Sequence, residues 1–411
     1  MLLSMTDPKI YTALLHLQHP WYISRIDVDV KAEEAHVFIT HHHGQLPCSS
    51  CGTMCNVRDH GDERVWRHLD LWQAKTFLHA AMPRTECPKH GVLTVNVPWS
   101  EPLSRFSMAF EARVILALQS TKTVEGARAI MQISWDEARG IMERAVARGL
   151  VRREEVVMPY LAADEKSYRK DRHFVTLLMD LDRGCIHGTA PGNSRASLEI
   201  LLNSLTKQQK QGVVAIAMDM HEPYRLAAES AFPAPMPAIV HDRFHVVSQM
   251  NKALNDVRIA EAAELAAEGY RDLVGTRQML LYGQENLPKR YKASFAKLKK
   301  SKLKTATVHA QKEVLRDLWN CSGVREARRH FRQWATWCRK TDIPRVTKVV
   351  NMIEKRLEDV ISYCKHPIST GPLEGMNSII MAIRRAGRGY RNAETFGMAI
   401  MFFCGGLNLM P

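Results

Sequence analysis

The alternation of apolar and polar positions divides the 411-residue chain into stretches of different character. Residues 1–100 contain short strand-like runs, such as the apolar run at residues 35–39. Residues 104–150 place apolar side chains at helical spacing, and residues 156–245 alternate between strand-like and helical runs. From about residue 246 to 365 the chain is long-helical and rich in Ala, Lys and Arg, and a last helical segment closes it. The pattern therefore predicts several folding units that combine helices and strands.

Three short helices are predicted within residues 104–150. Thr123 is placed to cap the second helix, and Ser134 is placed to cap the third. Glu137 follows Ser134 at the spacing of a capping box. Three helices with a short turn before the last resemble a helix-turn-helix, whose final helix enters the DNA major groove. Any small helical bundle would give the same pattern, so that alternative stays open at this point.

Residues 156–218 predict a mixed sheet. Its strands are the apolar runs 161–163, 173–179, 185–190 and 213–218. A helix over residues 194–209, which connects the third and fourth strands, carries four leucines on one face: Leu198, Leu201, Leu202 and Leu205. Three strands in a meander, a crossover helix and a fourth strand parallel to the first are the order of a ribonuclease-H-like fold. In such a sheet the first and fourth strands can be neighbours.

The net charge of the chain indicates what kind of partner it binds. Its formal net charge of +14 favours a polyanion, and nucleic acid is the first candidate; a protein that merely happens to be basic is the alternative. No apolar run approaches the length of a transmembrane helix. Several of the nine cysteines are scattered singly, which is typical of a reducing compartment. We therefore expect a cytoplasmic, bacterial-like protein without a membrane partner.

Two knuckles with the same outline stand out among the cysteines and histidines. Cys48 and Cys51 precede a glycine, and so do Cys87 and His90. Each pair can lie on one face of a tight turn, and two pairs make a closed tetrahedral zinc site. The intervening residues 52–86 are expected to hold a small hairpin. Cys55 is an alternative ligand, chance spacing of free thiols is another interpretation, and the run His41–His43 is expected to be a solvated loop.

Carboxylates follow the first and fourth predicted strands. Asp164 follows the run 161–163 and Asp219 follows the run 213–218, so both are expected side by side at the carboxyl ends of neighbouring strands. Two close carboxylates favour Mg²⁺ or Mn²⁺, whose preferred ligands are oxygens. Either residue alone would more simply be a turn or cap residue. Glu374 stands in the first turn of a helix that Pro372 can begin, and there a favourable interaction with the helix dipole is the simpler interpretation.

Four linked motifs resemble one known group of proteins. They are Asp164-Glu-Lys, Met218-Asp-Met-His-Glu-Pro-Tyr, His241-Asp-Arg-Phe-His-Val and Gly371-Pro-Leu-Glu-Gly-Met-Asn. From about residue 45 to the C-terminus, the chain resembles the DDE transposases of bacterial insertion sequences, and more narrowly the ISL-three group.

The resemblance implies roles for particular residues. Asp164, Asp219 and Glu374 would be the catalytic triad of metal-binding carboxylates. Asp242 and His245 match a D-x-x-H motif that would position DNA or the active site. His90 is a departure, because a fourth cysteine is expected there, and this leaves the zinc ligand set open.

The resemblance also implies a multidomain α/β architecture. A zinc-binding domain would cover residues 1–100, and a helix-turn-helix residues 104–150. A ribonuclease-H-like catalytic core with a mixed β-sheet would comprise residues 156–246 and 366–411. A large all-helical insertion over residues 247–365 would explain why Glu374 lies so far beyond Asp219.

The implied chemistry is two-metal phosphodiester cleavage. Two Mg²⁺ or Mn²⁺ ions would activate water at the end of the element, and the released 3′-hydroxyl would then attack target DNA. The partners would be double-stranded DNA, both terminal inverted repeats and target, and further copies of the chain in the DNA complex. The protein would associate with the bacterial nucleoid, and a structural Zn²⁺ would complete its cofactors.

Basic residues are expected to contact the DNA. In the third predicted helix of residues 104–150 these are Arg139 and Arg144. The segment Pro288–Lys312 has nine basic residues and no acid, namely Lys289, Arg290, Lys292, Lys297, Lys299, Lys300, Lys302, Lys304 and Lys312. A solvated helix face is the alternative for that segment. Arg384, Arg388 and Arg391 have helical spacing, although Gly387 and Gly389 make an unbroken helix there doubtful.

Two other functions are compatible with the sequence. A nuclease of the same fold would cut nucleic acid without joining it, and a zinc-finger regulator would bind DNA without chemistry.

Overall fold

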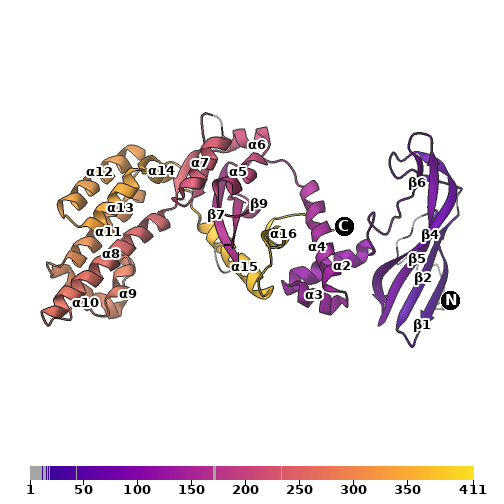
Figure 1. Cartoon of the computed structure of the whole chain (residues 1–411), viewed down its shortest axis with the longest axis horizontal. Coiled ribbons are helices and arrows are strands. Elements are labelled where there is room, and N and C mark those ends of the chain that lie inside the picture. The colour runs from indigo at the N-terminus through magenta and orange to yellow at the C-terminus, as the bar shows by residue number, and fades with distance from the viewer. Residues whose placement is uncertain are drawn as a thin grey trace. The chain divides into compact units, whose positions relative to one another are not determined.

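The computed structural model describes residues 12, 15, 17, 19–42, 44–169, 173–232 and 234–411. It separates into two compact units, Met1–Arg153 with Leu407–Pro411, and Glu154–Gly406. Figure 1 labels the elements of both. Within the described residues, no helix is long and apolar enough to span a membrane.

A β-sheet begins the first unit. Its strands are β1 (Trp21–Asp29), β2 (Glu34–His41), β3 (Gln45–Pro47), β4 (Met54–Leu71), β5 (Ala74–Cys87) and β6 (Gly91–Thr94). The order is β1-β2-β5-β4-β3, and β6 pairs with β5. Three tryptophans are buried at this sheet, and the ring of Trp99 contacts those of Trp21 in β1 and Trp66 in β4 edge to face.

Two expectations for this sheet need correction. The hairpin between the knuckles is not small, because β4 and β5 are 18 and 14 residues long and form the middle of the sheet. In the histidine run, His41 ends strand β2 and its ring nitrogen lies 2.9 Å from that of His60. His43 lies outside the described residues.

Three helices follow the sheet in the first unit: α2 (Met108–Thr121), α3 (Val124–Met131) and α4 (Trp135–Val151). Thr123 caps α3, and Ser134 caps α4 in a complete capping box with Glu137, as predicted. Glu111 of α2 is 1% exposed, and it is bound by Arg144 and Arg148 of α4. These two ion pairs to a buried carboxylate join the first and third helices.

The sheet of the second unit has five strands. These are β7 (Tyr160–Arg169), β8 (His173–Asp180), β9 (Cys185–Pro191), β10 (Ala215–Met218) and β11 (Ala238–His241), in the order β11-β10-β7-β8-β9. Strands β7, β8 and β9 form the predicted antiparallel meander. Strand β10 is parallel to β7 and next to it, which confirms that the first and fourth predicted strands are neighbours. The fifth strand, β11, is parallel to β10 and was not predicted.

Helices connect these strands. The predicted single helix over residues 194–209 is two helices, α5 (Arg195–Asn203) and α6 (Lys207–Gly212). The break occurs because Thr206 and Gln209 form a capping box that starts α6. The four predicted leucines are nevertheless all buried. Helix α7 (Glu222–Ala231) follows β10.

Between β11 and residue 365, where every residue is described, all the elements are helical. They are α8 (Arg243–Ala267), α9 (Arg277–Leu281), η1 (Gln284–Asn286), η2 (Lys289–Tyr291), α10 (Lys292–Lys300), α11 (Lys304–Arg316), η3 (Asp317–Asn320), α12 (Val324–Lys340), α13 (Pro344–Glu354), α14 (Leu357–Ile361) and η4 (Ser362–Cys364). They enclose an apolar core of their own, which includes Phe331 and Trp334. At the sheet, Ser362 donates a hydrogen bond to the carbonyl of Ile239 in β11.

The chain then returns to the sheet in α15 (Gly371–Ala386) and α16 (Ala393–Cys404). Pro372 stands in the first turn of α15, as predicted. The helix ends at Ala386, before Arg388 and Gly389 adopt positive φ angles of 52° and 96°. Arg388 therefore does not continue the helix face of Arg384, which confirms that the helix does not run unbroken through Gly387 and Gly389.

Candidate active site and metal cluster

The predicted zinc ligands converge at the open end of the β4–β5 hairpin, where β4 begins and β5 ends. Within the described residues, the ligand atoms of Cys48, Cys51, Cys87 and His90 all lie within 4.8 Å of one another. Gly52 and Gly91, which follow the two knuckles, have φ angles of +75° and +70°. Such angles suit glycine, so both glycines allow the tight turns that bring each ligand pair together.

The distances in this cluster fit a tetrahedral zinc site. Zn–S bonds of about 2.3 Å and Zn–N bonds of about 2.0 Å predict S···S separations of about 3.8 Å and S···N separations of about 3.5 Å. The Cys51 and Cys87 sulfurs are 3.8 Å apart, and His90 Nδ1 lies 3.6 Å from Cys87 Sγ and 3.9 Å from Cys48 Sγ. Cys55 is buried beside the cluster but is not one of the four converging residues.

The electrostatics of the cluster favour a bound cation. Backbone N–H groups, first that of Lys89 and also that of His90, lower the pKa of Cys87 to about 6. Thiolate is the form that binds metal, so this thiol is prepared as a ligand near neutral pH.

Asp164 and Asp219 lie at one cavity in the second unit. Ala163 of β7 pairs with Met218 of β10, so the next residue on each strand is one of the two aspartates. The cavity has a volume of about 600 Å³, and both aspartates line it. The prediction that Asp164 ends its strand is wrong, because β7 continues to Arg169 by pairing with β8 after β10 has ended.

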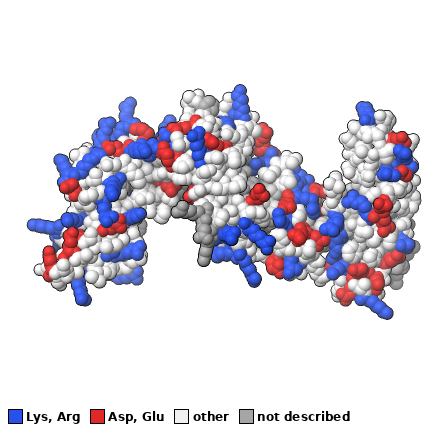
Figure 2. Space-filling view, viewed as in Figure 1, with Lys and Arg blue, Asp and Glu red and all other residues white. Residues whose placement is uncertain are grey.

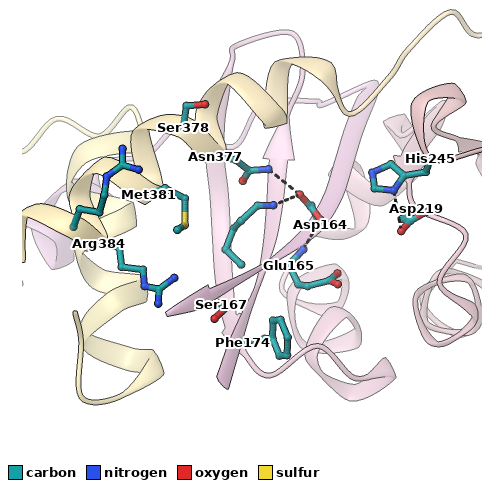
Figure 3. Close-up of a pocket in the computed structure, with 12 residues that line it drawn as sticks. Asp164, Glu165, Ser167, Phe174, Asp219, His245, Asn377, Ser378, Met381 and Arg384 are labelled. Carbon is teal, nitrogen blue, oxygen red and sulfur yellow. Dashed lines mark hydrogen bonds and ion pairs between the residues drawn. The ribbon is translucent and has the colours of Figure 1, made fainter. Parts of the chain in front are cut away.

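Asp164 is held by groups from two elements (Figure 3). Asn377 of α15 donates a hydrogen bond from Nδ2 to Asp164 Oδ2 at 2.8 Å. Lys166, on the same strand, places its ammonium 3.1 Å from the same oxygen. The backbone N–H of Glu165 donates to the other oxygen at 2.8 Å. One carboxylate therefore connects β7 to the helix that carries Glu374.

Asp219 has a histidine as its partner. His245 Nδ1 lies 3.2 Å from Asp219 Oδ2, and Figure 3 shows the two side chains facing each other. The hydrogen bond to Asp219 raises the pKa of His245, although burial opposes it. Burial by itself would raise the pKa of Asp219, but His245 and the N–H of Met220 lower it. Asp219 is thus an anion in contact with a base that is readily protonated.

Glu165 adds a third acidic group to the cavity. Burial first, and then the charge of Asp164, raise the pKa of Glu165, and Asp219 acts in the same direction. A cation placed among these carboxylates would relieve their mutual repulsion. The oxygen donors available here therefore fit a hard divalent cation.

Glu374 is not among the residues that line this cavity. Its side chain is exposed, in the first turn of α15. At helical spacing it shares a face with Ser378, Met381 and Arg385, all of which do line the cavity. Glu374 therefore extends the cavity-lining face by one turn, and its place in the triad stays a prediction.

Eight cavity-lining residues were missed by the sequence analysis as site residues, and four of them carry charged or amide side chains: Glu165, Lys166, Asn377 and Arg385. The first two are neighbours of Asp164 within its own motif, and Asn377 closes the motif that contains Glu374. These positions could have been inferred from the motifs, but their contacts depend on the approach of α15 to β7.

Known proteins are similar to this chain over most of its length. A family model described as a transposase, of the ISL3 type, matches residues 161–400, which is more than half of the chain. The chain belongs to the ISL3 transposase family. A model for the zinc-finger of transposases IS204, IS1001, IS1096 and IS1165 matches residues 45–90. A model for the helix-turn-helix domain of the ISL3 family matches residues 95–146.

Individual transposases agree with this assignment. The transposase for insertion sequence element IS1001 of Bordetella parapertussis is 25% identical over 360 residues, covering 86% of this chain and 87% of the relative. The transposase for IS1557 of Mycobacterium tuberculosis (strain CDC 1551 / Oshkosh) is 25% identical over 391 residues, covering 89% and 87%. The chain is thus an insertion-sequence transposase with a helix-turn-helix.

The arginines predicted to bind DNA in this transposase differ in their surroundings. Arg384 lines the cavity together with Arg385, whereas Arg388 lies in the turn after α15. In α4, Arg139 is partly exposed and pairs with Glu143 at 2.9 Å. Arg144 donates to the buried carboxylate of Glu111, so it holds α2 and α4 together.

The basic segment Pro288–Lys312 is less uniform than its sequence indicates. Lys299, Lys300 and Lys302 are exposed. Lys312 is 1% exposed and donates to the carbonyls of Leu280 and Tyr282, so it cannot contact DNA phosphates as predicted. Acidic residues outside the segment approach it, since Lys297 pairs with Asp272 at 2.9 Å and Lys304 with Glu264 of α8 at 3.9 Å. Blue and red side chains are accordingly mixed over the helical stretch in Figure 2.

Proposed function

We propose that this transposase cleaves DNA at the ends of its insertion sequence and joins the ends to target DNA at the Asp164–Asp219 cavity. The observation that supports the proposal is the register of β7 and β10, which ends with Ala163 beside Met218, so that the next residue on each side is one of the two cavity-lining aspartates. Asp164, Asp219 and Glu374 are the proposed ligands of two Mg²⁺ or Mn²⁺ ions. The strand order β9-β8-β7-β10-β11 supports a ribonuclease-H-like core, with residues 247–365 as its helical insertion.

The proposed cations would activate water and stabilise the attacking and leaving oxygens of phosphodiester cleavage. The chain's own residues hold the site in place. Asn377 orients Asp164, and Lys166 offsets part of its charge. His245 orients Asp219 in the same way. Arg384 (Figure 3) and Arg385, both residues of α15 that line the cavity, would bind the phosphates that flank the scissile bond.

The other proposed contacts are structural or electrostatic. Cys48, Cys51, Cys87 and His90 would hold one structural Zn²⁺, as their distances and the zinc-finger match support. The helix α4 would enter the major groove with Arg139 at its exposed side, while Lys299, Lys300 and Lys302 would contact phosphates. Several copies of the chain would assemble on the terminal inverted repeats.

A single assay tests the chemistry. A duplex carrying the element's terminal repeat is labelled at its end and incubated with protein, Mg²⁺ and a plasmid target. We expect 3′-end cleavage and joining of the label to the plasmid. Asp219→Asn should lower both by roughly 10³-fold, which is the scale of losing one preorganised charge at a reacting centre.

The control is Asp182→Asn, which neutralises an exposed carboxylate in the β8–β9 turn of the same sheet. It should leave both steps unchanged. Cleavage without joining would indicate a nuclease, and DNA binding with neither step would indicate a regulator.

A further inference from the structure

Asp242 touches three elements that carry the proposed site. Its side chain is 3% exposed, and its two oxygens have different partners. Oδ1 accepts a hydrogen bond from the N–H of Phe244 at 2.6 Å. Oδ2 accepts from Thr370 twice, from the backbone N–H at 2.8 Å and from the hydroxyl at 2.6 Å. Its own N–H donates to the carbonyl of Met218 at 3.2 Å.

Two of these contacts lead to Asp219. Met218 is the last residue of β10 and directly precedes Asp219. The bond to Phe244 makes Asp242 the N-cap of α8, which fixes the first turn of that helix. His245, the partner of Asp219, stands in this first turn. Asp242 therefore sets both the backbone before Asp219 and the helix that presents its histidine.

The third contact leads to Glu374 and Asp164. Thr370 is 3% exposed and directly precedes α15. Its carbonyl accepts the N–H of Glu374 at 2.8 Å, so the start of α15 is bonded to Thr370 and Thr370 to Asp242. One turn later, Asn377 bonds to Asp164. Asp242 is thus hydrogen-bonded to Met218, which precedes Asp219, and to Thr370, which precedes the helix that carries Glu374.

We propose that Asp242 is a positioning residue that fixes Glu374 relative to Asp219, by joining the N-termini of α8 and α15 through its two oxygens. A carboxylate suits this task because it accepts hydrogen bonds on both oxygens, whereas a serine or asparagine cap offers one acceptor oxygen. The bonds are charge-assisted and buried, which makes them strong. The inference rests on the proposed function, because it assigns Asp242 to the geometry of the proposed cation ligands.

Thr370 offers the sharpest test, since its hydroxyl can be changed without touching the carboxylates. Thr370→Val keeps the size and the backbone N–H but loses the hydroxyl that donates to Oδ2. Thr370→Ser keeps this donor and is the matched control. The readouts are Mn²⁺ binding followed by electron paramagnetic resonance, the Mn²⁺ concentration that half-saturates cleavage, DNA affinity, and the melting temperature.

We expect Thr370→Val to weaken Mn²⁺ binding and to raise the half-saturating concentration by about 10-fold, the scale of one charge-assisted hydrogen bond. DNA affinity should not change, and Thr370→Ser should remain within about twofold of wild type. Asp242→Asn, which keeps one acceptor, should shift Mn²⁺ binding in the same direction and serves if Thr370→Val does not fold.

A loss of melting temperature with unchanged Mn²⁺ binding in the folded variants would overturn the inference, because Asp242 would then only stabilise the fold. A wild-type protein that binds Mn²⁺ without cleaving DNA would overturn the proposed function instead, while the variants still decide the role of Asp242. Absence of Mn²⁺ binding in wild type would overturn both.

Discussion

The Cys/His cluster and the carboxylate cavity are two candidate metal sites of opposite construction. The cluster takes its four ligands from two short knuckles, and their atoms already have the separations of a tetrahedral site. The cavity takes its residues from β7, β8, α8 and α15 and from Asp219, which follows β10, and its third proposed ligand, Glu374, does not line it. A closed site is typical of structural metals and an open one of catalytic metals.

The partners of the ligands differ as well. In the cluster, the ligands contact one another and backbone N–H groups. In the cavity, each aspartate contacts a basic side chain, Lys166 or His245, and these compensate its charge. The fold around the cavity can therefore tolerate its carboxylates without metal, whereas we expect the cluster to depend on its metal.

The comparison is tested most strongly by removing a cluster ligand. Cys87→Ser should abolish zinc binding and unfold the end of the β4–β5 hairpin, since structural zinc contributes roughly 10 kcal/mol or more in small domains. Cys55→Ser is the matched control, because Cys55 is buried beside the cluster without belonging to it. Zinc content by mass spectrometry and circular dichroism provide the measurements. Equal zinc loss in both variants would contradict the assigned ligand set.

The next test asks whether Glu374, which does not line the cavity, completes its cation ligands. Glu374→Gln should lower DNA cleavage by roughly 10²- to 10³-fold, since it would remove a cation ligand from the reacting centre. Glu394→Gln is the control, because Glu394 is also exposed in the first turn of a helix. If Glu374 acts only on the helix dipole, both variants should change stability by less than about 1 kcal/mol and cleave normally. Cleavage rates and melting temperatures distinguish the two cases.

The third prediction concerns the stability of the second unit, and it is made at His309 in α11. Burial, and next the charge of Lys312, lower the pKa of His309 from 6.5 to about 4. The unfolded chain therefore takes up a proton at His309 near pH 6.5, whereas the folded chain does so only near pH 4. Stability of the second unit should fall by about 3 kcal/mol as the pH drops through this window.

His309→Gln should flatten that part of the pH dependence, because glutamine does not titrate. Urea unfolding of wild type and variant at pH 7, 5.5 and 4.5 measures the difference. If the unfolding free energies of wild type and His309→Gln fall in parallel as the pH drops, protonation of His309 is not the cause of the loss.

The smallest expected effect concerns the charge compensation in the cavity. Lys166→Met removes the ammonium beside Asp164, so divalent cations should bind a few-fold more tightly, within the roughly 1 kcal/mol of a partly exposed ion pair. Mn²⁺ titration against wild type provides the measurement. Lys210→Met, which alters a lysine outside the cavity-lining set, should leave the affinity unchanged. Weaker binding in Lys166→Met would show that Lys166 orders Asp164 rather than competing with the cation.

Much of the fold was predictable where the pattern is local. The capping box of Ser134 and Glu137 starts α4 as expected, because both residues lie within one turn of the same helix. The break between α5 and α6 was missed, although Thr206 and Gln209 have the same spacing. The apolar run at β11 was also missed as a strand, because four residues are too few for a clear period.

The sequence by itself determined the ligand types, the knuckle turns and the places of β7, β8, β9 and β10 along the chain. These depend on residues within a few positions of one another, where backbone geometry limits the possibilities. Only the tertiary structure decided that Asn377 bonds to Asp164, that Arg144 and Lys312 serve buried contacts, and that Asp242 joins α8 to α15. Such contacts join residues far apart in the chain, and no local pattern records which distant segments pack together.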